Sequence, residues 1–225
     1  MRPERLLLAA FGLALAGDLG SLLVGFGPGH TVCKPLLMPL LAGYAVCAWR
    51  AASGNGEPRM LVAALLFGWG GDVLLLFDAE PAFLGGMGSF AAGHVCWLLL
   101  FARYGTARPY ALWLGLAYGA ALAGTVALLW SDLPGDLRVP VAGYSLLLTA
   151  MAFRSARLGL AAGAGGALFL LSDTLIATGV AEWPQLPRPD FWIMLTYAAA
   201  QYLLARGVLT ARPAQATAPE ARTAA

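Results

Sequence analysis

The sequence predicts an all-α fold in which eight helices cross a membrane as one bundle. Three observations support this prediction. Apolar residues make up 60% of the 225 residues and charged residues only 12%, and the mean hydropathy is +0.72. The apolar residues form eight stretches of about 20 residues, the length that a helix needs to cross a bilayer. The basic residues alternate with these stretches. Together the three observations exclude a water-soluble domain.

The eight predicted spans are separated by short clusters rich in glycine, proline or charge. In chain order they are 5–26, 32–50, 59–78, 82–103, 109–130, 137–155, 157–179 and 190–209. The first could pass for a signal peptide, but its apolar run continues to Phe26 and is long enough to be a retained helix. Residues 1–210 therefore form a single transmembrane domain. Residues 211–225, rich in alanine, proline and threonine, are expected to be a disordered cytoplasmic tail.

The basic residues gather on one side of the membrane when the eight spans alternate. That side carries Arg2, Arg5, Arg50, Arg59, Arg103, Arg108, Arg154, Arg157, Arg206, Arg212 and Arg222. The other side carries only Lys34, Arg138 and Arg188. Positive charge favours the cytoplasmic side. The sequence therefore predicts a multi-pass protein of the cell (inner) membrane with both termini in the cytoplasm.

A faint internal repeat divides the domain into two halves, 1–105 and 106–210. Ala42-Gly43-Tyr44 recurs as Ala142-Gly143-Tyr144, and Gly71-Asp72 recurs as Ser172-Asp173. Each half contains four predicted helices, so the repeats are expected to be parallel, related by an axis along the membrane normal.

Three aspartates, Asp18, Asp72 and Asp173, lie inside predicted spans. A carboxylate in hydrocarbon is costly, so it is retained where it faces the protein interior and has a role. Counting from the cytoplasmic ends of the helices places all three about 20–24 Å deep, in the outer half of the bilayer. Asp72 and Asp173 occupy corresponding positions of the two halves, which indicates a functional pair. Asp18 has two readings, as a site residue or as a structural link between helices.

Other polar residues are candidates for binding a substrate or supporting this pair. They are Lys34, His94, Tyr144, Ser172, Gln201 and Asp18. His94, Tyr144 and Gln201 have depths that allow one shared cavity, although such residues also link helices by hydrogen bonds. Lys34, the only lysine, is expected at the outer surface where the second span begins. There it suits a phosphate or a carboxylate, or simply extends to the interface. The cysteines show no metal-binding spacing, and neither a metal nor a cofactor is expected.

Several of these residues form an ordered set that resembles the YhhN family of eight-helix membrane proteins, which includes the animal lysoplasmalogenases. The set consists of Lys34-Pro35, Gly71-Asp72, Phe90-x3-His94, Tyr144, Gly166-x5-Ser172-Asp173 and Tyr197-x3-Gln201-x-Leu203. The resemblance implies hydrolysis of the vinyl ether bond of a lysoplasmalogen to a fatty aldehyde and a glycerophospho-base. It also implies Asp72 and Asp173 as the catalytic pair. The expected partners are then a lysophospholipid substrate and membrane lipids, not nucleic acid, and the oligomeric state is left open.

Vinyl ether hydrolysis begins with a proton delivered to carbon, and water then captures the resulting cation. One neutral and one ionised aspartate suit this task, as in other carboxylate pairs that divide such roles. Two alternatives remain. Membrane carboxylates and parallel repeats also suit a proton-coupled transporter or a lipid-binding protein. An intramembrane aspartyl protease is less consistent with the sequence, because Trp69 replaces the first glycine of a GxGD motif and no tyrosine precedes Asp173.

Overall fold

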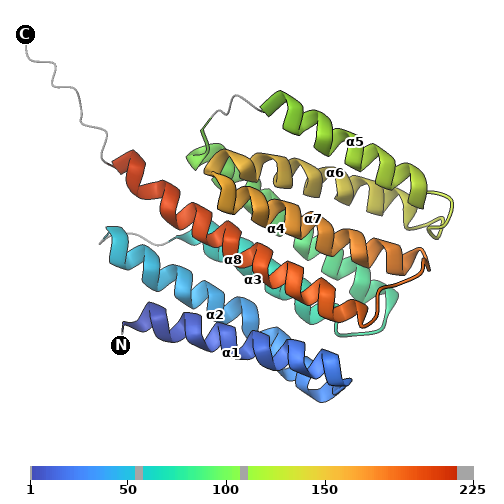
Figure 1. Ribbon diagram of the computed structural model, residues 1–225, viewed down its shortest axis with the longest axis horizontal. Coiled ribbons are helices and arrows are strands. Elements are labelled where there is room, and N and C mark those ends of the chain that lie inside the picture. Colours follow the sequence, from blue (N-terminus) through green and yellow to red (C-terminus); the bar gives the residue numbers. More distant parts are fainter. Residues whose placement is uncertain (1, 54–57, 107–110, 217–225) are drawn as a thin grey trace, which may run out of the picture.

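The computed structural model describes residues 2–53, 58–106 and 111–216, and within these ranges it is helical, with no strand. The helices are α1 (Pro3–Val24), α2 (Gly27–Ser53), α3 (Arg59–Leu74), α4 (Glu80–Tyr104), α5 (Ala111–Leu129), α6 (Arg138–Ser155), α7 (Leu160–Val180) and α8 (Pro189–Ala216), with a short 3-10 turn (Ala156–Leu158) before α7. They lie side by side as one bundle (Figure 1). The all-α prediction and its order of eight helices are confirmed.

Six of the described helices are long and apolar enough to cross a membrane: α1, α2, α4, α5, α6 and α7. α3 is shorter than the predicted span 59–78, since it has 16 residues and ends at Leu74. α8 continues to Ala216, into the segment expected to be a tail, and residues 217–225 lie outside the described ranges. The start of α1 and the end of α8 lie at the same end of the bundle (Figure 1). Which side of the membrane that end faces stays a prediction.

α2 begins at Gly27, earlier than the predicted span 32–50, and it contains Pro35 and Pro39. Proline lacks the N–H that a helix needs, so Pro39 leaves the carbonyl of Pro35 without its usual donor. The indole Nε1 of Trp69 on α3 donates to that carbonyl at 2.9 Å. A contact between helices thus supports the irregular turn. Lys34 consequently lies about two turns inside α2, and its expected position at the start of the helix is wrong.

α8 is the central helix, in contact with α1, α2, α3, α4 and α7. In Figure 1 it lies with α3 between the α1–α2 pair and the other helices. Glycines bring α3 close to its neighbours. A Cβ on Gly71 would lie 2.5 Å from the ring of Phe90 on α4, and one on Gly68 would lie 2.8 Å from Nε2 of Gln201 on α8. These contacts place the residue after Gly71, Asp72, at the meeting point of α3, α4 and α8.

The loop between α5 and α6 is tied to the loop between α7 and α8. Nε1 of Trp183 donates to Oδ2 of Asp132 at 2.7 Å, and the hydroxyl of Ser131 donates to Oδ1 at 2.9 Å. These two hydrogen bonds lower the pKa of Asp132, which lies in the loop outside the spanning segments. The link holds the C-terminal ends of α5 and α7 together.

Candidate active site

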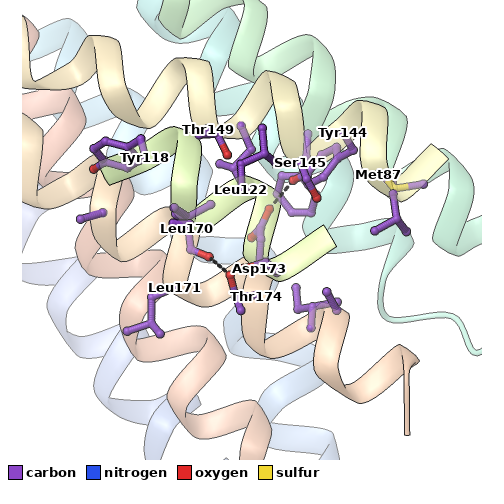
Figure 2. Close-up of a pocket in the computed structure, with 18 of the residues that line it drawn as sticks. Met87, Tyr118, Leu122, Tyr144, Ser145, Thr149, Leu170, Leu171, Asp173 and Thr174 are labelled. Carbon is purple, nitrogen blue, oxygen red and sulfur yellow. Dashed lines mark hydrogen bonds between the residues drawn. The ribbon is translucent and has the colours of Figure 1, made fainter. Parts of the chain in front are cut away.

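Each of the two predicted catalytic aspartates is held by a tyrosine from another helix. Asp72 on α3 is buried, and its Oδ2 accepts a hydrogen bond of 2.8 Å from the hydroxyl of Tyr197 on α8. Asp173 on α7 accepts a hydrogen bond from the hydroxyl of Tyr144 on α6, as Figure 2 shows. Gln201, one turn after Tyr197, donates to the Tyr197 hydroxyl at 3.3 Å. The structure therefore contains two aspartate–tyrosine pairs.

His94 extends the pair formed by Asp173 and Tyr144. Its Nε2 lies 3.1 Å from the hydroxyl oxygen of Tyr144. Because the tyrosine hydrogen is directed to Asp173, Nε2–H of His94 is the donor in this contact. Its other ring nitrogen, Nδ1, is buried and has no hydrogen-bond partner among the described residues. His94 therefore fixes the Tyr144 hydroxyl, and through it the carboxyl of Asp173.

Aromatic rings join the two aspartate–tyrosine pairs into one cluster. Tyr197 packs edge-on against Phe90 at 5.7 Å and against Phe169 at 5.4 Å between ring centroids. Phe169 in turn packs against His94 at 4.8 Å. Asp173 interacts electrostatically with Asp72 and with Tyr197. The structure thus brings Asp72, Asp173, His94, Tyr144 and Gln201 into one region through these contacts.

A cavity of about 520 Å³ opens beside Asp173, between α4, α5, α6 and α7 (Figure 2). Most of its wall is apolar, and its polar lining residues are Tyr118, Thr125, Tyr144, Ser145, Thr149, Asp173 and Thr174. The volume lies in the range of ordinary small-molecule sites. Asp72, Lys34, His94 and Gln201 are not among the residues that line it. The glycine before Asp72, Gly71, packs instead against the ring of Phe90, which does line the cavity.

One wall of the cavity is formed by α5, which packs mainly on α6 and more lightly on α7. A second, smaller apolar core closes one end. Its buried residues are Leu129, Leu133, Leu137, Val141 and Ala181, and they pack against Phe83, Met87, Ala177 and Val180 of the cavity lining. The cavity therefore has a closed end near the α5–α6 and α7–α8 loops, and a side formed by a lightly packed helix.

A second group of charged residues lies on the other side of Asp72. Asp18 on α1 is fully buried, and Nδ1 of His30 on α2 donates to its Oδ1 at 2.7 Å. The Oδ2 of Asp18 has no hydrogen-bond partner among the described residues. Lys34, one turn after His30, is only 8% exposed, and it attracts Asp72 electrostatically. The predicted surface position of Lys34 is therefore corrected to a buried one within electrostatic range of Asp72.

Two residues of this arrangement were not predicted as site residues. Tyr197 belongs to the family pattern, and it lies one helical turn before Gln201. This spacing could have identified it as a site residue. His30 lies in a stretch rich in glycine and proline that is typical of a loop, so no sequence pattern identified it as a site residue. Ser172, which was predicted to support the site, donates instead to the carbonyl of Ile193 on α8 at 3.1 Å, a link between helices. The described residues contain no group of three histidines, cysteines or acids suited to a metal ion.

Comparison with known proteins gives a consistent result. The sequence model of the YhhN family matches residues 29–208. The lysoplasmalogenase TMEM86B of Homo sapiens is 35% identical over 177 residues, 79% of this chain and 73% of the relative. The TMEM86B protein of Sus scrofa is 36% identical over 78% of this chain and 73% of its own length. A lysoplasmalogenase of Mycobacterium tuberculosis is 33% identical over 85% of this chain and 77% of its own length. No solved structure matches the chain.

Proposed function

We propose that this chain, which belongs to the YhhN family, acts as a lysoplasmalogenase. Its substrate would be a lysophospholipid with a vinyl ether, and its products a fatty aldehyde and a glycerophospho-base. The observation that carries the proposal is the position of Asp173, a carboxyl at the wall of an apolar cavity and held by Tyr144. We also propose the inner membrane as its location, with both termini in the cytoplasm, from the bias of the arginines.

The first step is a proton transfer from Asp173 to carbon. The apolar cavity accommodates the alkenyl chain, with the double bond against the carboxyl. The O–H bond of the acid breaks, and the π electrons of the double bond form a new C–H bond at the carbon remote from the ether oxygen. Positive charge then develops on the neighbouring carbon and is shared with that oxygen. General acid catalysis of this kind requires a carboxyl within hydrogen-bond reach of the reacting atom.

The second step is the capture of this cation by water. The water oxygen bonds to the cationic carbon, and its proton passes to the carboxylate of Asp173, which restores the acid. The resulting hemiacetal collapses when its hydroxyl proton moves to the ether oxygen and the C–O bond breaks. The aldehyde and the glycerophospho-base are released, and one water molecule has been consumed. The atoms and electrons of these steps balance without a cofactor.

Asp72 has a different place in this scheme because it does not line the cavity. It is close enough to interact electrostatically with Asp173. In a site of low dielectric constant, the negative charge of Asp72 stabilises the cation that forms beside Asp173. Tyr197 holds the Asp72 carboxylate in position for this role, and Gln201 in turn donates to the Tyr197 hydroxyl.

The proposal is tested with purified protein in detergent and a lysoplasmalogen as substrate. We expect the release of fatty aldehyde, detected directly. The matched control is the lysolipid with a saturated ether, which has no double bond to protonate and must give no aldehyde. Intact plasmalogen tests whether the second acyl chain is tolerated. Flux of substrate across liposomes without any aldehyde contradicts the proposal and favours a transporter, and cleavage of a peptide instead favours a protease.

The cavity itself is tested by filling it. Ala121 on α5 lines the cavity, so Ala121→Trp places an indole where the alkenyl chain is expected to lie. We expect KM to rise about tenfold or more, the equivalent of roughly 1.4 kcal/mol of lost binding. The control is Ala120→Trp, at an exposed neighbouring position outside the cavity lining. Equal kinetics for the two variants would show that the substrate binds elsewhere.

A further inference from the structure

The two aspartates of the site differ in the charges that face them. Asp72 is faced by Asp18 from α1, Lys34 from α2, Asp173 from α7 and Tyr197 from α8. From α4 it is the uncharged ring of Phe90 that packs against the neighbouring glycine. Among the described residues, Asp72 therefore has one cation within electrostatic range, Lys34, which is buried.

Asp173 has no comparable cation in the part of the chain that the structure describes. Among the described residues, those that interact with it are Tyr144 by a hydrogen bond and Asp72 and Tyr197 electrostatically. None of these groups carries positive charge. Its carboxyl lies at the wall of a mostly apolar cavity whose other polar lining residues are uncharged, so little there stabilises a negative charge.

Lys34 is also free to act on Asp72, although Asp18 lies nearby. Asp18 already accepts a hydrogen bond from His30. Lys34 itself forms no hydrogen bond with a described side chain, and a buried ammonium persists where a carboxylate compensates it. Lys34 precedes Pro35, whose carbonyl accepts the hydrogen bond from Trp69 one helical turn before Asp72, so the ammonium lies on the part of α2 that packs against the Asp72 turn of α3 and attracts this carboxylate.

We propose that Lys34 keeps Asp72 ionised and thereby makes Asp173 the acid that protonates the substrate. The inference rests on the proposed function and adds the division of roles within it. Two carboxylates that interact in a medium of low dielectric constant do not readily ionise together, and a cation beside one of them decides which is charged. The neutral acid is then at the cavity wall, and the anion lies outside the cavity lining. Lys34 is a positioning residue, since it does not line the cavity and acts through Asp72.

The test is the pH dependence of kcat/KM for Lys34→Met and Lys34→Arg. Without the cation, Asp72 ionises less readily, so we expect the acid limb of the Lys34→Met profile to move to higher pH by about one unit. This corresponds to a roughly tenfold lower rate on that limb. KM should change less than about twofold. Lys34→Arg, which keeps the charge, should recover most of the activity. Lys34→Gln serves as a second neutral variant if Lys34→Met does not fold.

A double variant separates this role from a structural one. If Lys34 acts through the charge of Asp72, adding Lys34→Met to Asp72→Asn should lower activity no further. A Lys34→Met profile that coincides with that of the unmodified protein overturns the inference. So does a rise in KM with unchanged kcat, which would instead assign Lys34 to the substrate phosphate. Absence of aldehyde release by the unmodified protein would count against the proposed function itself, and the two failures are therefore distinguishable.

Discussion

Asp173→Asn is expected to lower kcat for aldehyde release by about 10²- to 10⁴-fold, the range that general acid catalysis contributes. Asparagine has the same shape as the neutral acid and accepts the hydrogen bond from Tyr144, so the fold and the cavity are retained. It has no acidic proton to give to carbon. The measurement is the initial rate of aldehyde release at saturating lysoplasmalogen, with purified protein of unchanged thermal stability.

The control for this variant is the same substitution outside the site. Asp78→Asn changes an exposed acid after α3 and should leave kcat and KM as they are. The substrate should still bind to Asp173→Asn, because the apolar lining of the cavity is intact. A variant that turns over at the full rate would remove Asp173 from the chemistry, and with it the mechanism built on this cavity.

The helical architecture could be predicted because membrane spans depend on length and apolarity, which a sequence displays directly. The start of α2 could not. Glycine and proline in the stretch before Lys34 ordinarily indicate a loop, yet the helix begins at Gly27. The carbonyl of Pro35 is satisfied by Trp69, a residue 34 positions later in the chain. This hydrogen bond depends on a tertiary contact, which the local sequence around Pro35 does not predict.

For the candidate site, the sequence pointed to the two aspartates but to fewer of the residues that hydrogen-bond to them. A carboxylate within an apolar run stands out from its surroundings, and so Asp72 and Asp173 were identified. The repeat pairs Tyr44 with Tyr144, which suggests equivalent roles. In the structure Tyr144 holds Asp173, whereas Tyr44 packs against Tyr202 at 6.3 Å between ring centroids. Tyr197 takes the corresponding place beside Asp72. The tyrosine that holds Asp72 therefore comes from α8, and the predicted repeat, which pairs Tyr44 with Tyr144, did not indicate this.

Asp72→Asn is expected to lower kcat by about 10²-fold while KM changes less than about twofold. The loss in kcat has the size found when a preorganised electrostatic group is removed from an active site. KM is expected to stay because Asp72 does not line the cavity. The separate determination of kcat and KM for the lysoplasmalogen gives the answer. A large rise in KM would show that Asp72 contacts the substrate directly.

This variant also has a cost in stability that must be separated from its effect on catalysis. Removing the charge of Asp72 leaves the ammonium of Lys34 buried without its carboxylate, which is expected to destabilise the protein by about 1–3 kcal/mol. Adding Lys34→Met removes that uncompensated charge and should restore much of the thermal stability. Activity should remain low, because the anion that stabilises the cationic intermediate is still missing. If the double variant regained activity together with stability, the loss in Asp72→Asn would be one of folding, and Asp72 would have only a structural role.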